Sequence, residues 1–383
     1  MTVKSEKINV LVLPDLFPKN ENDWVGIFVV DYIKSVIPNC IPVVFYSRLV
    51  GDNQDIKQEV FGNDFDVFRW SYKKQVSSLL KPLYYLLWFS KTVNQIVSLK
   101  KEIDIIHAHG AILNGSVAYL LSKQLKVPFV ISEHTGPFSK ISDSFVKKNW
   151  AKFILNRADN VFAVSNHLKK EMIAIGIKEA NVTVSFNPVD TNLFKCKPNL
   201  SRVKNMLFVS RLEPFKGGLR TLKAFHKLEG KRDNWHLTIC GDGPEKDAII
   251  QYVDEFQLGN CVTIKGVLTK PEYVKELHNS SFLVFPSLHE SFGLIPVEAM
   301  TCGLPVITTN STAMPEYINT QNGVLLNTSS VKEISEVMID MMKNISNYES
   351  TIISKNMITR FGIDNFGKML IENYKTAINN YKK

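Results

Sequence analysis

The stretch HESFGLIPVEAM, residues 289–300, carries two carboxylates separated by seven mostly apolar residues. The apolar run before it, SFLVFPS, predicts a buried strand, and FGLIPVEAM predicts the start of a helix. Pro296 is compatible with the first helical turn, because the first N–H groups of a helix have no partner within it. Glu290 would then lie on the loop at the strand end, with Glu298 about one and a half turns into the helix.

Such a loop and helix start offer two kinds of ligand contact. The backbone N–H groups near Phe292, Gly293 and Leu294 would attract a phosphate, and the two carboxylates would accept hydrogen bonds from hydroxyl groups. A ligand with both phosphates and many hydroxyls fits both features, and a nucleotide sugar is such a ligand. From these residues alone, a plain helix start that happens to carry two acids remains the alternative.

A second stretch, VSRLEPFKGG (209–218), also follows a predicted strand. Arg211 and Lys216 lie on the loop beyond the strand end, and Gly217 and Gly218 open the next helix. Two cations beside a backbone that glycine lets a ligand approach closely suit a diphosphate. The alternative is a solvated loop with ordinary surface cations.

Two further motifs are weaker. CGDGPE (240–245) has Gly241 and Gly243 but Lys246 where a dinucleotide-binding motif needs its third glycine, so it predicts a tight turn and disfavours a nicotinamide enzyme. The chain contains no Gly-x-x-x-x-Gly-Lys-Ser/Thr sequence, which argues against a P-loop kinase or ATPase. DFD (64–66) resembles the short acidic motif with which some sugar transferases hold a metal, but a three-residue match arises easily by chance. We therefore expect no metal and no cofactor.

Histidines close two other predicted strands. His107 and His109 in HAHG share one face of a strand, and His109, at the strand end, could turn towards a ligand. His134 in SEHTG ends the next strand and is a second candidate of the same kind; the resemblance described below places it on the acceptor side. Two histidines at this spacing can bind zinc, but no further ligand cluster supports zinc here. The common alternative is a buried histidine that is satisfied within the core.

Short runs rich in Val, Ile and Phe alternate with longer amphipathic stretches, a pattern that predicts parallel strands joined by helices. The pattern occurs twice, and the polar, proline-containing segment 187–202 separates the two sets. We expect two doubly wound α/β domains with a deep cleft between them, and ligands beyond the carboxyl ends of the strands. The strands are expected within 8–13, 104–109, 128–134, 160–165, 205–210, 236–240, 261–266, 281–287, 305–309 and 323–326.

The composition is that of a globular protein, and it bears on the possible ligands and the cellular compartment. The 383 residues include 45% hydrophobic and 22% charged residues, with a net charge of +9 divided evenly between the two halves of the chain. This charge can favour anionic ligands, acidic lipid surfaces or nucleic acid, or can simply keep the protein soluble. Five scattered cysteines with no Cys-x-x-Cys pair argue against a disulfide framework and favour a reducing compartment.

The first residues, MTVKSEKINVLVLP, read as a buried strand and lack the features of a signal peptide. No stretch predicts a transmembrane helix. The aromatic stretch PLYYLLWFS (82–90) is too short to span a bilayer; it could touch a membrane surface, although burial of a helix face is its more common role.

Taken together, these segments resemble the retaining family 4 glycosyltransferases, which have the GT-B fold. The arrangement of a Glu, seven residues and a second Glu in ESFGLIPVE is similar to that family's signature. The other matching segments follow in order along nearly the whole chain: GIF (26–28), DIIHAHG (104–110), SEH (132–134), VSNHLKKEMIAIGI (164–177), NPVDTNLF (187–194), VSRLEPFKG (209–217), GDGPE (241–245) and NGVLL (322–326).

The resemblance implies a role for each site residue. Arg211 and Lys216 would neutralise the donor diphosphate, Glu290 would hydrogen-bond sugar hydroxyls, and Glu298 would bind the ribose. His109 would lie beside the transferred sugar and the acceptor. The remaining donor contacts would come from Gly26, Gly243, Ser291, Phe292, Gly293 and Leu294.

The resemblance also implies a domain plan: an acceptor-binding domain over 1–195, a nucleotide-sugar-binding domain over 196–358, and a last helix, 359–383, that crosses back to the first domain. The expected reaction is metal-independent transfer from a UDP- or GDP-sugar to a glycan or lipid-linked acceptor, with no nucleic-acid partner. It would serve synthesis of a cell-surface polysaccharide or glycoconjugate, in the cytoplasm or peripherally on the inner face of its membrane. A nucleotide-sugar epimerase of GT-B fold and a non-catalytic nucleotide-sugar-binding subunit are the alternatives.

This sequence departs from the family pattern at two places. Thr312 and Ala313 stand before MPEYI (314–318), where many relatives have two glycines. The amino-terminal loop has the single glycine Gly26, preceded by Trp24 and Val25, where many relatives have two adjacent glycines.

Overall fold

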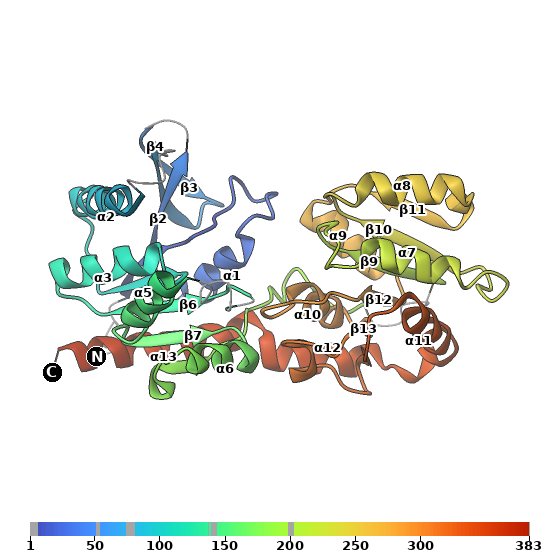
Figure 1. Cartoon of the computed structure of the whole chain (residues 1–383). Helices are drawn as coiled ribbons and strands as arrows, with labels where there is room; N and C mark the ends of the chain where they lie inside the picture. The colour runs from blue at the N-terminus through green and yellow to red at the C-terminus, as the bar shows by residue number, and fades with distance from the viewer. Residues whose placement is uncertain are drawn as a thin grey trace. The chain divides into compact units, whose positions relative to one another are not determined.

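The computed structural model describes residues 7–50, 54–73, 81–136, 138, 144–197 and 203–382 (Figure 1). The chain forms two compact units. The first consists of Met1–Pro188 with Ile363–Lys383, and the second of Val189–Gly362. The sequence-based plan divided the chain after residues 195 and 358 instead. The segment that returns to the first unit is the last helix.

The first unit is built on an eight-stranded sheet in the order β3-β4-β2-β1-β5-β6-β7-β8. Every neighbouring pair is parallel except β3 and β4, which form an antiparallel pair at one edge. Its strands are β1 (Ile8–Leu13), β2 (Cys40–Val50), β3 (Gln54–Phe61), β4 (Phe65–Lys73), β5 (Ile105–His109), β6 (Phe129–Glu133), β7 (Asn160–Ala163) and β8 (Val182–Val184).

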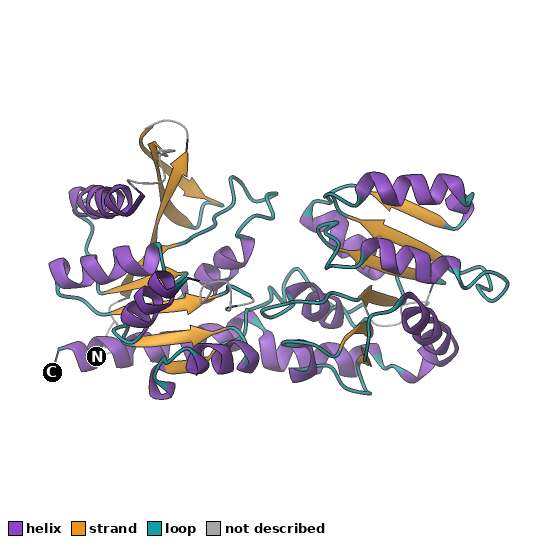
Figure 2. Cartoon of the chain, in the orientation of Figure 1, coloured by secondary structure: helices purple, strands orange, loops and turns teal. Residues whose placement is uncertain are grey.

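Helices cover this sheet, as Figure 2 shows. The contacts between helices form two groups: α1 packs against the carboxyl-terminal helix α13, whereas α2 contacts α3, which in turn contacts α5. The helices of this unit are α1 (Ile27–Val36), α2 (Lys81–Ser98), α3 (Asn114–Leu125), α5 (Phe145–Leu155), α6 (Asn166–Ala174) and α13 (Ile363–Tyr381), with a short 3-10 turn at Glu179–Asn181.

The second unit has a wholly parallel six-stranded sheet in the order β11-β10-β9-β12-β13-β14. Its strands are β9 (Asn205–Val209), β10 (His236–Cys240), β11 (Val262–Lys265), β12 (Phe282–Phe285), β13 (Val306–Thr309) and β14 (Gly323–Leu326). Its helices are α7 (Gly218–His226), α8 (Lys246–Glu255), α9 (Lys270–His278), α10 (Leu294–Thr301), α11 (Val331–Asn344) and α12 (Ser350–Phe361), with 3-10 turns at Leu258–Asn260, Met314–Glu316 and Ile345–Asn347.

Continuous apolar runs form the central strands because helices cover both faces of a parallel sheet. All five residues of β5, IIHAH, are buried, as are all five of β6, FVISE. Serine hydroxyls cap the helices that follow some of these strands: Ser165 accepts the N–H of Leu168, and Ser144 accepts that of Lys147. The local sequence thus fixes both the buried strands and the points where the chain turns back.

The expected α/β class with two parallel sheets is confirmed, and each predicted strand lies where the sequence placed it. Strands β2, β3, β4 and β8 were not predicted. β3, QDIKQEVF, is mostly polar and lies at the sheet edge, where one side of the strand has no partner strand. Within the described part of the chain, no helix is long and apolar enough to cross a bilayer.

Candidate active site

In the second unit, the predicted donor-binding residues lie on loops that follow adjacent parallel strands. Arg211 and Lys216 follow β9, Gly243 follows β10, and Glu290 follows β12. Because these strands are neighbours in the order β10-β9-β12, their loops emerge side by side at the carboxyl edge of the sheet. This is the placement that the sequence predicted for a ligand site.

Two glycines bring the loops after β9 and β10 into backbone contact. A Cβ on Gly241 would lie 1.9 Å from the carbonyl oxygen of Ser210, and one on Gly243 would lie 2.8 Å from that of Leu212. The N–H of Leu212 donates to the carbonyl of Asp242 at 2.9 Å. Gly243 therefore has a clear structural role in joining the two loops, whatever contact it makes with a ligand.

The side chains of Lys216 and Glu290, 74 residues apart in sequence, form an ion pair between Nζ and Oε1. Both are largely buried, with 18% and 13% of the side chain exposed. The Lys216 Nζ also lies 5.2 Å from the ring centre of Phe215 and 5.7 Å from that of Phe285. Aromatic walls reduce solvent around the ammonium, so its charge acts more strongly on a nearby anion than a surface lysine would.

Arg211 has a different environment. Its guanidinium pairs with Glu213 at 3.0 Å, and 76% of its side chain is exposed. The structure therefore brings Lys216 and Glu290 together directly, while Arg211 remains a solvent-exposed cation on the same loop. Its charge is available to a ligand but is screened by water.

The chain turns sharply between Glu290 and α10. Gly293 has a φ of 85°, in the left-handed region, and a Cβ there would lie 2.2 Å from Met314 Cε and 2.6 Å from the Tyr317 hydroxyl. That hydroxyl lies 2.6 Å from the carbonyl oxygen of Phe292 and 3.1 Å from that of Gly293. The buried tyrosine thus holds the helix start in place. Ser291 lies partly buried in the same turn.

Thr312 stands where the resemblance to the family led us to expect a glycine. Its φ is 51°, a left-handed conformation that favours glycine. Its side-chain oxygen accepts the backbone N–H of Glu290 at 3.2 Å, a contact that glycine could not make. The threonine therefore ties the loop after β13 to the residue that pairs with Lys216.

Glu298 lies on α10, and the whole residue is only 5% exposed. Burial, with the neighbouring Glu298 carboxylate, raises the pKa of Tyr273 well above its ordinary value. Burial and Glu298 likewise raise the pKa of the Cys302 thiol. The carboxylate is therefore set into the protein beside the phenol of α9, and its predicted contact with a ribose remains a prediction.

In the first unit, three histidines form a stacked cluster at the ends of β5 and β6. The rings of His107 and His109 lie 4.6 Å apart, and those of His109 and His134 lie 5.2 Å apart with only 11° between their planes. His109 Nδ1 is 2.9 Å from His134 Nε2, and His107 bonds the hydroxyls of Tyr374 and Ser132. The cluster is therefore tied to the carboxyl-terminal helix.

Burial keeps these histidines neutral. It lowers the pKa of His107 to about 3, with the nearby His134 adding to the shift. It lowers the pKa of His134 to about 3 and that of His109 well below its ordinary value. His109 Nε2 is buried and makes no hydrogen bond in the structure as described. An unpaired buried nitrogen is uncommon and costs free energy, so it is a candidate contact for a ligand.

Sequence reasoning missed a carboxyl pair close to this cluster. Glu133 is fully buried and accepts the N–H groups of Ala111, His134 and Thr135. Asp15, after β1, accepts a hydrogen bond from Asn114 Nδ2 at 2.6 Å. Although part of Asp15 is exposed, the surrounding protein desolvates its carboxyl and, with Glu133, raises the pKa to about 7. The position of Asp15 shortly after β1 was the one feature of the sequence that could have indicated a functional role for it.

Gly26 begins α1, where its φ is 75°. A Cβ there would lie 2.3 Å from the carbonyl oxygen of Leu16 and 2.7 Å from the backbone nitrogen of Phe17. The glycine lets two parts of the amino-terminal loop pack against each other. Its predicted approach to donor phosphates is an additional role that this geometry leaves untested.

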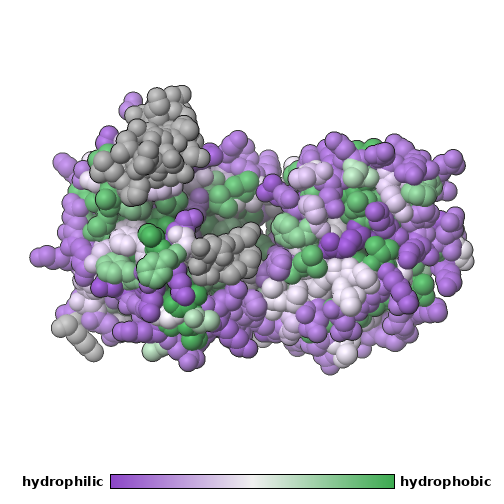
Figure 3. Space-filling model, viewed as in Figure 1, coloured by the Kyte–Doolittle hydropathy of each residue, from purple (hydrophilic) through white to green (hydrophobic). Residues whose placement is uncertain are grey.

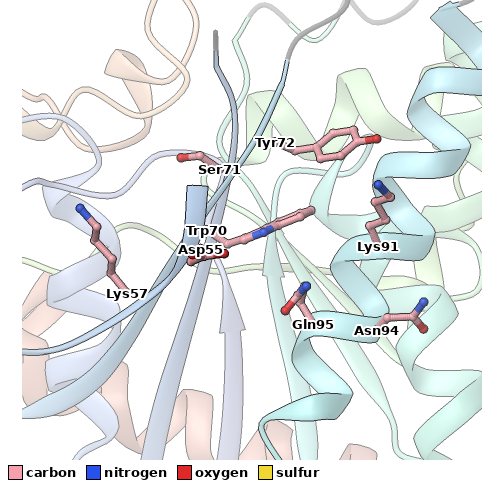
Figure 4. Close-up of a pocket in the computed structure, with 8 residues that line it drawn as sticks. All are labelled: Asp55, Lys57, Trp70, Ser71, Tyr72, Lys91, Asn94 and Gln95. Carbon is pink, nitrogen blue, oxygen red and sulfur yellow. The ribbon is translucent and has the colours of Figure 1, made fainter. Parts of the chain in front are cut away.

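The acids of DFD are paired with lysines: Asp64 lies 3.8 Å from Lys34, and Asp66 lies 3.1 Å from Lys101. Among the residues that the structure describes, no group of three or more His, Cys, Asp or Glu side chains could hold a metal ion. A pocket of about 710 Å³ lies between β4 and α2, away from all predicted site residues (Figure 4). None of the residues that line this pocket is a predicted site residue, so the candidate site lies at the strand-end loops.

Family models match nearly all of the chain in two consecutive parts. The model described as Glycosyltransferase Family 4 matches residues 36–193, and the model described as Glycosyl transferases group 1 matches residues 191–356. The chain belongs to glycosyltransferase family 4. This family membership agrees with the resemblance that the ordered sequence motifs carried.

Characterised and uncharacterised relatives within the family are distant. The chain is 26% identical over 300 residues to N-acetyl-alpha-D-glucosaminyl L-malate synthase of Bacillus anthracis, an alignment that covers 75% of this chain and 74% of that one. It is 26% identical over 243 residues to an uncharacterised glycosyltransferase of Methanocaldococcus jannaschii, covering 63% of this chain and 66% of the relative.

Solved structures establish the fold. Anabaena HepE in complex with UDP and glucose superposes with a TM-score of 0.74 at 19% identity, over 96% of this chain and 99% of HepE. Sucrose-phosphate synthase from Thermosynechococcus elongatus superposes with a TM-score of 0.76 at 17% identity, over 98% of this chain and all of that one. This family 4 chain has the GT-B fold.

Proposed function

We propose that this chain transfers a sugar from a UDP- or GDP-sugar to a hydroxyl of a glycan or lipid-linked acceptor, with retention of configuration at the anomeric carbon. The reaction would serve the synthesis of a cell-surface polysaccharide or glycoconjugate. One observation carries the proposal: the largely buried Lys216–Glu290 pair lies on strand-end loops next to the start of α10. HepE, a structural relative, has been solved with UDP and glucose bound.

The Lys216–Glu290 pair is suited to bind the diphosphate and the sugar of a nucleotide sugar. As the sugar leaves, negative charge develops on the β-phosphate of the nucleoside diphosphate. Lys216, the N–H groups at the start of α10 and, more weakly, Arg211 would stabilise that charge. Glu290 would accept hydrogen bonds from sugar hydroxyls, and Glu298 from the ribose. The carboxylates therefore bind the donor and are not an acid–base pair.

His109 would contact the transferred sugar and the acceptor through its unpaired Nε2. The acceptor oxygen forms its bond to the anomeric carbon while the bond to the β-phosphate oxygen breaks, and the acceptor proton passes to the departing diphosphate. A neutral histidine is suited to this role because it can hydrogen-bond a hydroxyl without adding a charge. His134 holds the ring through its 2.9 Å contact.

Metal independence is part of the proposal because lysine, arginine and helix N–H groups supply the positive charge that a divalent ion would otherwise provide. We expect EDTA to leave the rate of transfer unchanged within about twofold. Loss of transfer in EDTA, with recovery on addition of manganese, would contradict this part of the proposal. We place the reaction in the cytoplasm, with peripheral attachment to the inner face of the membrane.

The test begins with the purified chain and a panel of UDP- and GDP-sugars, scored by thermal shift. A donor at 100 times its Kd stabilises a folded protein by about 2.7 kcal/mol, which is readily measured. The selected donor is then incubated with glycan and lipid-linked acceptors, and release of the nucleoside diphosphate is followed. Conversion of the donor without any acceptor would indicate an epimerase, and binding without turnover would indicate a binding subunit; either result would overturn the proposal.

A further inference from the structure

Three helices of the first unit leave large apolar side chains on the surface. Of the 19 large hydrophobic residues that are exposed in the described ranges, seven lie on α2, α3 and α5, which contact one another in that order. We refer to these seven residues as the apolar face. They are Tyr85, Leu86, Leu87, Leu120, Phe145, Val146 and Trp150, and they range from 37% to 82% exposed.

On α2, apolar side chains are exposed because the turn formed by residues 86–89 is apolar on all sides. Trp88 and Phe89 are buried at 2% and 6% exposure, so they account for the helix face that packs inwards. Leu86 and Leu87 point the other way and remain 59% and 47% exposed. The side chains of Pro82, Leu83 and Tyr84 lie outside the described ones. Within the rest of PLYYLLWFS, the interpretation as a buried helix face holds for Trp88 and Phe89 but not for Leu86 and Leu87.

On α5 the first turn is the most exposed apolar segment. Phe145 and Val146 are 82% and 75% exposed, whereas Ala151, Ile154 and Leu155 face inwards. Trp150, one turn after Val146, donates its indole N–H to Ser116 of α3 at 2.8 Å and still leaves 38% of the residue exposed. An indole with one polar contact and one free edge is common at a boundary between water and an apolar phase.

The charges on these helices are of one sign. α2, α3 and α5 contain six lysines and no Asp or Glu. By contrast, α1 contains Asp31, α6 contains Glu171, and α13 contains Asp364 and Glu372. The acidic side chains nearby come from other elements, such as Asp55 of β3, which lines the same pocket as Lys91.

Apolar and basic side chains are thus mixed on three helices that contact one another in sequence. In Figure 3 hydrophobic side chains lie among hydrophilic ones over α3 and α5. Lys147 and Lys148 follow Phe145 and Val146 directly in the sequence. Exposed apolar residues beside lysines favour a partner that offers both hydrocarbon and negative charge.

We propose that the apolar face of α2, α3 and α5 docks on the surface of a bilayer that contains anionic lipid. Phe145, Val146 and Leu86 enter the boundary between headgroups and acyl chains, and the lysines contact the headgroups. The proposed lipid-linked acceptor gives this attachment a purpose, and in that respect the inference rests on the proposed function. Vesicle binding itself requires neither donor nor turnover.

The experiment is flotation of the full-length chain with vesicles, half phosphatidylglycerol and half phosphatidylcholine, compared with phosphatidylcholine alone. We expect flotation with the anionic vesicles only, and its loss in high salt. Phe145→Glu with Val146→Glu should reduce the bound fraction at least about tenfold, because two charges replace the inserted side chains. Ile250→Glu with Val267→Glu, at exposed apolar positions of the second unit, is the matched control and should float as the wild type does.

A second variant separates charge from apolar contact. Lys147→Glu with Lys148→Glu should weaken binding to the anionic vesicles by at least about 25-fold, since each lysine near such a surface contributes about fivefold. UDP- and GDP-sugar binding, scored by thermal shift on every variant, should be unchanged, which separates failure of this inference from failure of the proposed function. Equal flotation on neutral vesicles, flotation unaffected by either variant, or self-association of the chain through this face would overturn the proposal.

Discussion

The two units share one architecture, but the strand ends of their sheets carry opposite chemistry. In the second unit the loops hold a largely buried ion pair, Lys216–Glu290, and the exposed cation Arg211. In the first unit the corresponding edge holds three histidines that burial keeps neutral. In both units the fold places polar residues at the carboxyl edge of the sheet, and the types of residue on the loops differ between the units.

This difference separates two tasks of a transferase. A diphosphate leaving group requires fixed positive charge, and in the proposed function Lys216 and Arg211 of the second unit supply it. An acceptor hydroxyl and a neutral sugar can be bound by uncharged hydrogen-bonding groups, and in the proposed function the neutral histidines of the first unit have that role. Variants on the two sides should consequently fail in different ways.

The largest effect is expected for Lys216→Ala. The variant removes the cation at the proposed β-phosphate and leaves the Glu290 carboxylate without its partner, so kcat/KM should fall about 100- to 1,000-fold. Release of nucleoside diphosphate measures the rate, and circular dichroism checks the fold. Lys332→Ala, at a lysine that is 79% exposed and 4.0 Å from Glu336 in the same unit, is the control and should retain full activity.

His109→Gln should reduce turnover about 10- to 100-fold, the loss expected for one hydrogen bond made at the reacting centre. Its KM for the donor should change by less than about twofold, because the proposed diphosphate contacts lie in the other unit. His226→Gln, which alters a histidine bonded to Tyr252 in the second unit, is the matched control. A His109→Gln enzyme with normal kcat would remove His109 from the proposed site.

Arg211→Ala should cause a smaller loss, about tenfold in kcat/KM. Its side chain is 76% exposed, and water screens its charge more than that of Lys216. The loss should grow when the assay is run at low ionic strength, where screening is weaker. An Arg211 variant as damaged as Lys216→Ala at every salt concentration would show that the arginine moves into direct contact with the diphosphate.

The smallest effect concerns acid stability. The unfolded chain protonates its histidines as the pH falls through about 6.5, while folded His107 and His134, whose pKa values are about 3, stay neutral. Acid therefore lowers the free energy of unfolding, by at most about 1.4 kcal/mol per pH unit for each histidine. Asp15, with its pKa raised to about 7, acts in the opposite direction as the pH falls from 7 to about 4.

Urea unfolding between pH 7 and pH 5 tests this balance. In Asp15→Asn the opposing group is gone, so stability should fall more steeply with acid than in the wild type. Nitrogen chemical shifts of the three imidazoles should remain those of the neutral form at pH 5. Protonation of His109 near pH 6 would contradict its placement in a neutral cluster.

Sequence alone predicted the α/β class, the central strands and the strand-end loops, because continuous apolar runs and glycine turns are local signals. It could not show that Lys216 pairs with Glu290, since tertiary structure brings together two residues 74 positions apart. Asp15 and Glu133 were missed because isolated acids become informative only once burial is known. β3 lies at a sheet edge with β4 next to it, and both strands carry too many polar residues to resemble buried strands.

For α2 the sequence showed an apolar run but not which of its side chains are buried. An apolar run indicates that side chains avoid water but does not say where they go, so PLYYLLWFS was compatible with burial and with a membrane surface. Only the packing of Trp88 and Phe89 against the unit revealed which side chains were left outside.

We propose that the loops of the second unit bind the nucleoside diphosphate. Calorimetric titration of UDP and GDP into the wild type, Lys216→Ala and His109→Gln tests this binding. We expect that one of the two nucleotides binds the wild type, that Lys216→Ala weakens its Kd at least about tenfold, and that His109→Gln leaves it unchanged within about twofold. Equal binding by wild type and Lys216→Ala, or a loss caused by His109→Gln instead, would contradict it.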